Sequence, residues 1–504
     1  MISLKDYKAI PSGTSQFPIE FIQQCGALVL DEREETITIG VAKTSDWSLL
    51  KDIERYHKAG VENKFTFVEI DNGELASFVF NLVTEQVASM KSRINESDLD
   101  GELLDQLANN APIINLVNGI ILDAVRCGAS DIHFERQRSK AIVRYRLDGV
   151  LQLAREFPTN IFPSISTRIK ILSSLNILEQ RRPQDGRFSV AHAQRSLDIR
   201  VSVVPTATGE SLVLRILNIA EEPLTLFQLG LMPRQQQLLV DAIKKRQGII
   251  LMTGPTGSGK TTTLNAMIAA MNDGEKKIIT IEDPVEFHIS GVDQIQTNDD
   301  IGLSFSTILR RVLRQDPDVI MVGEIRDIDT AQLSIRASMT GHLVLSSLHT
   351  NNAVSTVHRL LDMDISPHFL AAVLQIICAQ RLVRKLCTTC KTEVKNQQDR
   401  SRFLAEYKKL GFPVPSSNVS LFTADPNGCS ACLGRGYKGR MAIMEIVPID
   451  QEMRTLIESQ IDQKSMEDYL RESGHPSLAY NALETVRVGM TSFEEVSQLI
   501  LSGL

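Results

Sequence analysis

Residues 248–262 read Gly-Ile-Ile-Leu-Met-Thr-Gly-Pro-Thr-Gly-Ser-Gly-Lys-Thr-Thr, an apolar run followed at once by the pattern GxxxxGK[ST]. The apolar run is typical of a buried strand, and residues 261–271 continue in a helical pattern. A phosphate-binding P-loop requires this order of strand, loop and helix. Its glycines let backbone N–H groups surround phosphate oxygens, and the helix N-terminus adds partial positive charge. The predicted nucleotide-binding residues are Gly254, Pro255, Thr256, Gly257, Ser258, Gly259, Lys260, Thr261 and Thr262, with Lys260 directed at the β- and γ-phosphates and Thr261 at Mg²⁺.

Two further apolar runs end in carboxylates. Val319-Ile-Met-Val is followed by Gly323 and Glu324, which indicates a buried parallel strand that brings Glu324 beside the nucleotide. A carboxylate there can orient or deprotonate the attacking water in phosphoryl transfer. Residues 278–281 form another apolar run and lead into the acidic segment Glu282-Asp-Pro-Val-Glu286. Acids at a strand end of an α/β fold indicate the crevice where ligands bind.

A later apolar run, residues 343–348, lies between His342 and His349. Each histidine can be structural or part of a site, and the sequence leaves both interpretations open. Strand and helix patterns alternate along the part of the chain that carries these motifs. They predict an α/β, RecA-like doubly wound domain over residues 234–504.

Four of the seven cysteines form two CxxC pairs, Cys387 with Cys390 and Cys429 with Cys432. Four thiolates suit a tetrahedral Zn²⁺ that has no open position, which is a structural site. The 38 residues between the pairs exceed the spacing of common zinc ribbons, so we predict a zinc element over residues 385–440 with an insertion. A redox CxxC needs only one pair, and disulfides are disfavoured in a chain expected to stay in the cytosol. The other three cysteines are predicted to be small buried hydrophobes: Cys25, Cys127 and Cys378.

Length and composition indicate which class of protein carries these motifs and how many domains it has. The chain has 504 residues, of which 43% are hydrophobic and 23% charged, and this excludes disorder as a class and predicts about three domains. The apolar stretches fall short of a membrane span, and the N-terminus lacks a secretory signal. The predicted organisation is an N-terminal α/β domain, an acidic linker, a second α+β domain, a second linker and the domain with the P-loop: residues 1–95, 96–110, 111–220, 221–233 and 234–504.

The net charge of −7 is an average of two very different regions. Residues 1–110 hold 10 Lys and Arg against 19 Asp and Glu, whereas residues 381–440 hold 12 against 4. The basic segment is either a solvated face or a surface that approaches anionic phospholipid or an acidic partner. The acidic total and the lack of an aromatic and basic strand platform argue against a nucleic-acid partner.

These motifs together resemble those of the secretion ATPase superfamily, and most closely its type II secretion ATPases. Residues 254–261, 282–286, 323–327 and 340–351 resemble its Walker A, Asp box, Walker B and His box, and residues 129–133 and 183–187 resemble its second-domain signatures. The resemblance implies a catalytic role for Glu324, a place near the γ-phosphate and water for Glu286, and γ-phosphate sensing for His349. It also implies arginines that reach the nucleotide from the second domain or from a neighbouring subunit: Arg200 and Arg215, and Arg310 and Arg314.

The resemblance implies a hexameric ATP-hydrolysing motor that drives pseudopilus assembly and export of folded proteins. Its first 95 residues would bind the cytoplasmic domain of an inner-membrane secretion protein, and the motor would be cytoplasmic and peripherally attached to that membrane. A type IV pilus extension ATPase is the nearest alternative. A nucleic-acid-translocating ATPase and a GTPase switch are further alternatives, although the chain has no Asn-Lys-x-Asp guanine motif.

Overall fold

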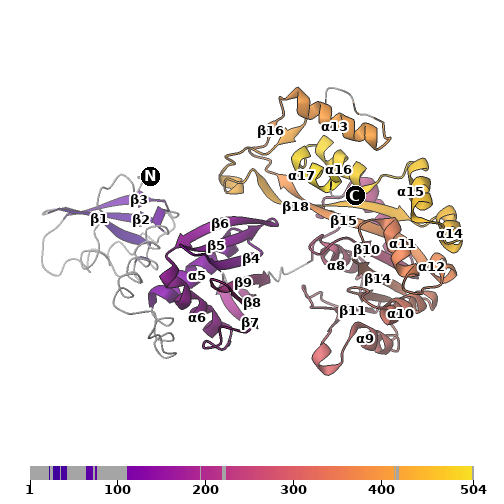
Figure 1. The fold of residues 1–504 in the computed structure, drawn as a ribbon, viewed down its shortest axis with the longest axis horizontal. Helices are drawn as coiled ribbons and strands as arrows, with labels where there is room; N and C mark the ends of the chain where they lie inside the picture. Colours follow the sequence, from indigo (N-terminus) through magenta and orange to yellow (C-terminus); the bar gives the residue numbers. More distant parts are fainter. Residues whose placement is uncertain are drawn as a thin grey trace. The chain divides into compact units, whose positions relative to one another are not determined.

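The computed structural model describes most of the chain and divides it into two compact units, Met1–Asn218 and Ile219–Leu504. The described residues are 22, 26–33, 36–42, 64–71, 74–75, 111–192, 195–217, 223–413, 415 and 419–501 (Figure 1). The predicted acidic linker 96–110 and Cys25 lie outside them. Among the described residues, no helix has both the length and the apolar character that crossing a bilayer demands.

The first unit begins with a three-stranded sheet. Its strands are β1 (Ala27–Arg33), β2 (Thr36–Ala42) and β3 (Lys64–Ile70), and β2 pairs antiparallel with β1 and parallel with β3. The alternating and apolar runs in this region predict all three strands, and the structure confirms them. The helices predicted over residues 47–58 and 73–90 lie outside the described residues, except for Glu74 and Leu75.

The first unit also contains a six-stranded antiparallel sheet. Its strands are ordered β6-β5-β4-β9-β8-β7: Val150–Phe157, Ala141–Leu147, Asp131–Arg136, Gly209–Leu217, Arg195–Thr206 and Gln184–His192. Helices α5 (Ala111–Arg126) and α6 (Phe162–Leu172) pack on one face through a shared apolar core (Figure 1). Along β8, Ile199 and Val201 are buried while Arg200 between them is exposed, because successive strand residues point to opposite faces.

The second unit is built on a seven-stranded sheet of order β12-β11-β13-β14-β10-β15-β18. The first six strands are parallel: Asp293–Gln296, Ile278–Glu282, Val319–Val322, Leu343–Leu348, Gly248–Thr253 and Leu374–Leu386. Strand β18 (Tyr437–Pro448) pairs antiparallel with β15 at the edge. The predicted strands over 248–253, 278–281, 319–322 and 343–348 are all present.

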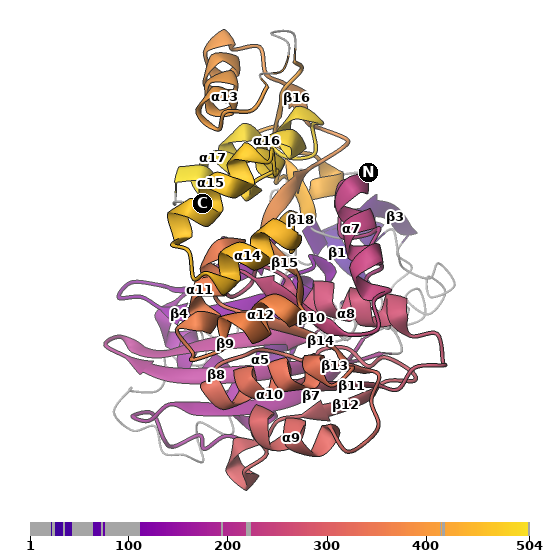
Figure 2. The same ribbon diagram turned by 90° about the vertical axis from the view of Figure 1, so that its right-hand side faces the viewer.

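Helices cover both faces of this sheet, as a doubly wound fold requires. Helices α7 (Pro233–Ile243) and α8 (Lys260–Met271) lie on one face, with residues such as Ile250 of β10. The other face receives Ile249 of β10 and a larger group of helices: α9 (Phe305–Val312), α10 (Ile328–Met339), α11 (Ala353–Leu361), α12 (Pro367–Val373), α14 (Gln451–Glu458) and α15 (Gln463–Glu472). Figure 2 shows α7 and α8 on one side of the sheet and α10 and α12 on the other. The predicted fold class is confirmed.

The segment 221–233, predicted as a linker, contributes part of the second unit's core. Leu226, Leu229 and Leu231 are buried against Leu239 of α7. The backbone N–H of Ala442 on β18 also donates to the carbonyl oxygen of Leu229 (3.1 Å). Turn-forming residues therefore lie near the boundary between the two units, but the apolar residues among them pack into the core of the second unit.

A small separate core lies at the end of β15 and β18. It joins helix α13 (Gln397–Lys409) to α16 (Leu478–Arg487) and α17 (Phe493–Leu501) through Phe403 and Tyr407. The hydroxyl of Tyr407 donates to Glu484 of α16 at 2.7 Å. The same part of the chain includes the short strands β16 (Thr392–Glu393) and β17 (Phe422–Thr423), and α15 (Gln463–Glu472) precedes α16. Residues 387–436 thus form an insertion between two long sheet strands.

Candidate nucleotide and metal sites

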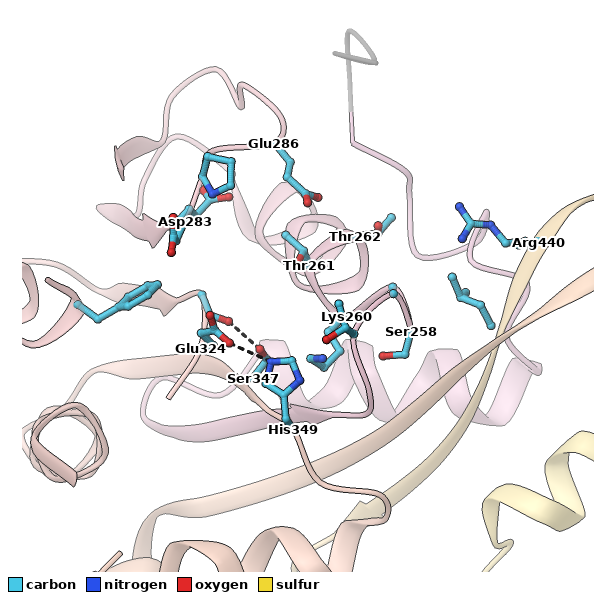
Figure 3. A pocket seen from close by; sticks show the side chains of 18 residues that line it. Ser258, Lys260, Thr261, Thr262, Asp283, Glu286, Glu324, Ser347, His349 and Arg440 are labelled. Atoms are coloured by element: carbon cyan, nitrogen blue, oxygen red, sulfur yellow. Dashed lines mark hydrogen bonds and ion pairs between the residues drawn. The ribbon is translucent and has the colours of Figure 1, made fainter. Parts of the chain in front are cut away.

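A pocket lies where the parallel strands of the second unit end (Figure 3). The loop after β10, the acidic segment after β11, Glu324 after β13 and His349 after β14 all line it. These four strands are neighbours in the sheet, so residues as far apart in sequence as Thr256 and His349 meet at one edge. This is the ligand-binding crevice that the strand pattern predicts.

The loop between β10 and α8 has the backbone that its glycines permit. Gly254 has φ 146° and Gly259 has φ 85°, which are conformations that other residues rarely adopt. A Cβ atom on Gly254 would lie 2.5 Å from the carbonyl oxygen of Gln380 on β15. The glycines are therefore required both by the turn and by the close approach of β15 beneath it.

Lys260 begins helix α8 and is buried, with 8% of its surface exposed. Its ammonium group donates to the carbonyl oxygens of Gly254 (2.7 Å) and Pro255 (3.2 Å). Burial lowers the pKa of Lys260, and nearby Glu324 opposes this effect. The side chain thus lies over the loop whose backbone surrounds the predicted phosphate position.

Glu324 forms a small charged network at the end of β13. Nε2 of His349 lies 2.9 Å from one carboxylate oxygen, and the guanidinium of Arg326 pairs with the other. Burial alone would raise the pKa of Glu324, but the hydrogen bonds from Arg326 and His349 outweigh burial and hold the pKa below its usual range. Glu324 is therefore held as a carboxylate, the form that can accept a proton or orient water.

The acidic segment after β11 divides into a buried and an exposed part. Glu282 is 2% exposed; its Oε1 accepts from Thr280 (2.7 Å) and Gln294 (3.0 Å). Its Oε2 is buried without a hydrogen-bond partner among the described residues. Asp283 and Glu286 are exposed at the pocket, and Asp283 pairs with Arg326 at 3.3 Å.

Two buried polar atoms test whether this pocket suits a nucleotide with Mg²⁺. Oγ of Ser258 and Oε2 of Glu282 both lack a partner in the described part of the chain, and both residues line the pocket. A hydroxyl suits a phosphate oxygen, and a carboxylate suits the water shell of a hard cation. The residues present therefore fit the predicted ligands, with Thr261 beside them.

Some pocket residues carry no sequence motif. Leu382 of β15 and Arg440 of β18 line the pocket from the edge of the sheet. Figure 3 shows Arg440 at one end of the pocket and Glu324 at the other, with Lys260 between them. Arg326, which pairs with Glu324, also received no predicted role. Only the pairing of β15 with β10 and β18 brings residues 382 and 440 to the P-loop.

The predicted arginines lie in two groups. Arg310 and Arg314, at α9, are exposed, and neither is among the described residues that line the pocket. Arg310 pairs with Asp329 at 3.3 Å. Arg200 and Arg215 belong to the first unit, where they face each other across β8 and β9, and Arg215 also pairs with Asp131 at 2.9 Å.

The four CxxC cysteines converge in the second unit. Their sulfur atoms all lie within 4.8 Å of one another, with Cys387–Cys429, Cys390–Cys432 and Cys429–Cys432 at 3.7–3.8 Å. A tetrahedral Zn²⁺ with bonds of about 2.3 Å places its sulfurs about 3.8 Å apart, so the donor set fits. Backbone N–H groups of Cys429 and Gly436 donate to the sulfur of Cys432, which favours its thiolate form. Of the other cysteines, Cys378 is buried and Cys127 is half-buried.

The fold and the pocket define a P-loop ATPase of the RecA-like class, and comparisons with known proteins place it more closely. Residues 106–498 match the model of the family described as "Type II/IV secretion system protein". Type II secretion system protein E of Pseudomonas aeruginosa is 42% identical over 410 residues, covering 81% of this chain and 79% of its own length. Type II secretion system ATPase E of Vibrio cholerae is 37% identical and covers 94% of both chains.

A solved structure supports the same assignment. The crystal structure of the pilus retraction motor PilT with bound ADP has a TM-score of 0.51 and 26% identity, and covers 75% of this chain and 95% of that one. The chain therefore belongs to the type II/IV secretion system protein family and is an ATPase. The resemblance drawn from its motifs is confirmed.

Proposed function

We propose that this protein is the ATP-hydrolysing motor of a type II secretion system, which drives pseudopilus assembly and export of folded proteins. One observation carries the proposal: the P-loop, Glu324 and His349 converge on one pocket at the ends of adjacent parallel strands. Several relatives named as type II secretion system protein E or ATPase E are 36–42% identical to this chain, and this supports the choice of system.

In the proposed mechanism, the N–H groups of the P-loop and Lys260 bind the phosphates, and Glu324 orients or deprotonates the attacking water. His349, 2.9 Å from Glu324, would register the γ-phosphate. Glu286 would lie near the γ-phosphate and its water. Mg²⁺, held through Thr261, would neutralise charge between the β- and γ-phosphates. Arginine is the donor best suited to the negative charge that develops on the transferred phosphate. We propose that Arg200 and Arg215 reach the nucleotide when the two domains close. Arg310 and Arg314 would face a neighbouring subunit in the assembled ring.

We further propose a ring of six subunits, attached peripherally to the inner membrane. Residues 1–95 would dock on the cytoplasmic domain of a membrane secretion protein. Four cysteine thiolates would hold a structural Zn²⁺, and the basic segment around them would approach anionic phospholipid. The exposed residues Leu433 and Lys438 lie within that segment, and their mix of charge and apolar surface supports this role.

The test is the ATPase rate measured against oligomer size, with and without the cytoplasmic domain of the membrane partner. We expect the rate to rise with assembly and with the partner, and to vanish in Lys260→Ala under every condition. A rate that is independent of assembly would contradict the ring mechanism. Liposome co-sedimentation that responds to neither anionic lipid nor salt would contradict the lipid contact.

A type IV pilus extension ATPase is the second candidate. The type IV pilus assembly ATPase PilB of Myxococcus xanthus is 41% identical over 400 residues and covers 78% of this chain, and the PilB of Pseudomonas aeruginosa is 36% identical and covers 95% of it. Pull-down of the full chain with the cytoplasmic domains of both systems would separate the two functions. We expect the secretion partner to bind and the pilus partner not to bind.

A further inference from the structure

Gln380 of β15 lies directly beneath the P-loop, although no motif includes it. It is 1% exposed, and its side-chain amide makes two hydrogen bonds. The Nε2 group donates to the carbonyl oxygen of Ser258 at 2.7 Å, and the Oε1 atom accepts from the hydroxyl of Thr263 on α8 at 2.8 Å. Both bonds are buried, so the amide ties the loop and the first turn of α8 to the neighbouring strand.

The bond to Ser258 fixes the orientation of one peptide group. In a trans peptide the C=O and the following N–H point in opposite directions. Since the carbonyl of Ser258 points to Gln380, the N–H of Gly259 points away from β15. Ser258, labelled in Figure 3, and Gly259 both line the nucleotide pocket, so that N–H is presented as a donor to phosphate.

The same peptide needs an external constraint, because Gly259 allows either orientation. Gly259 has φ 85°, and glycine populates positive and negative φ about equally. A reversed peptide would turn a carbonyl oxygen, rather than an N–H, toward the phosphates. A side chain at 259 cannot supply the constraint, because its Cβ would lie 2.9 Å from Nε2 of Gln380.

We propose that Gln380 is a positioning residue that locks the Ser258–Gly259 peptide in the phosphate-binding orientation. The inference rests on the proposed assignment of nucleotide to this P-loop. This constraint affects the backbone N–H groups that bind the β-phosphate, and it does not affect contacts with the base and the ribose. Its loss therefore weakens ADP and ATP binding more than AMP binding.

The experiment compares ADP and AMP affinities of the full chain, with AMP measured by competition against a fluorescent ADP. In Gln380→Met, which keeps the side-chain length but neither donor nor acceptor, we expect ADP to bind about 10- to 100-fold more weakly. AMP affinity should change by less than about threefold. An unchanged ADP affinity, or equal losses for ADP and AMP, would overturn the lock.

Gln375→Met is the matched control, since it makes the same chemical change near the other end of β15. Gln375 accepts from Lys245 at 2.5 Å and lies away from the P-loop, so ADP affinity should stay at the wild-type value. Thr263→Val removes only the second bond of Gln380. If it weakened ADP binding as much as Gln380→Met, the anchor on α8 would be responsible instead of the Ser258 peptide.

Gln380→Glu supplies a readout that does not depend on the methionine variant folding well. An ionised carboxylate repels the Ser258 carbonyl, whereas a protonated carboxyl group can donate to it. ADP affinity relative to wild type should therefore recover as the pH falls from about 8 to about 6, because burial raises a carboxyl pKa. A pH-independent ratio would contradict the proposal. Lys260→Ala tests the underlying assignment separately, because retained ADP binding in that variant would place the nucleotide elsewhere.

Discussion

The nucleotide pocket and the cysteine cluster share two strands but are built in opposite ways. Strands β15 and β18 line the pocket through Leu382 and Arg440, and continue to Cys387 and the turn after Cys432. In the cluster every proposed ligand atom is a side-chain sulfur. In the pocket most of the donors proposed for phosphate are backbone N–H groups, which must be oriented by their neighbours.

This difference shows that a sequence motif can name every residue that its site needs, or only some of them. The CxxC pairs name all four donors, and the fold has only to bring them together. The P-loop pattern names residues whose conformation depends on side chains elsewhere, such as Gln380, which is 122 positions from Ser258. We therefore expect the loss of one cysteine to abolish metal binding at the cluster. The loss of one pocket residue should reduce nucleotide binding or hydrolysis to an extent that depends on the residue.

Removal of the metal should have the largest effect. We expect Cys432→Ser to abolish stoichiometric zinc and to open residues 385–440 to limited proteolysis, because structural zinc contributes roughly 10 kcal/mol to the folding of small metal domains. Metal content and fragment mapping are the measurements. Cys127→Ser, which changes a cysteine of the first unit, is the control and should keep its zinc. Full zinc content in Cys432→Ser would show that the cluster is not the metal site.

Glu324→Gln should affect chemistry rather than binding. The amide keeps the shape of the side chain but cannot accept a proton, so we expect ATP hydrolysis to fall by about 10²- to 10⁴-fold. ATP affinity should stay within about threefold, since Lys260 and the loop are intact. Glu452→Gln, which changes an exposed acid on α14 in the same way, makes a matched control for the loss of one charge. Normal turnover in Glu324→Gln would remove this residue from the mechanism.

Much of the site follows from local sequence, for a physical reason. Parallel strands buried on both faces are continuous apolar runs, and ligand residues follow their carboxyl ends, so Lys260, Glu324 and His349 can be located from pattern alone. The structure brings these three together and shows that His349 contacts Glu324, a point which the sequence left open.

The rest depends on strand pairing between distant segments. Leu382 and Arg440 enter the pocket because β15 pairs with both β10 and β18, and no local pattern gives that order. Arg326 follows Glu324 closely in sequence, yet its pairing with Asp283 needs the positions of two strand ends. The burial of Leu226, Leu229 and Leu231 is not predicted from the sequence for the same reason. They lie among turn-forming residues, and the residues that they pack with lie on α7, α8 and β18.

Arg326→Gln should shift the acid side of the pH profile. Arg326 and His349 hold the pKa of Glu324 below its usual range against the effect of burial, so loss of Arg326 raises that pKa. Hydrolysis needs the carboxylate, and it should therefore decline at a higher pH than in wild type. The measurement is kcat against pH, with Arg471→Gln as the control because Arg471 pairs with Asp468 on α15 instead. An unshifted acid limb would mean that Arg326 does not control this carboxylate.

Arg384→Gln should have the smallest effect, and it tests whether the two sites are separable. Arg384 lies on β15 between Gln380 and Cys387, makes hydrogen bonds to both carboxylate oxygens of Glu495 on α17 (2.6–3.1 Å), and stacks over the ring of Tyr437 at 4.1 Å. Because this pair is only partly exposed, its loss should destabilise the second unit by about 1–2 kcal/mol, seen as a lower Tm. Zinc content and ADP affinity should not change, since neither site uses this side chain as a ligand. A parallel loss of zinc and of ADP affinity would instead show that β15 transmits changes between the cluster and the P-loop.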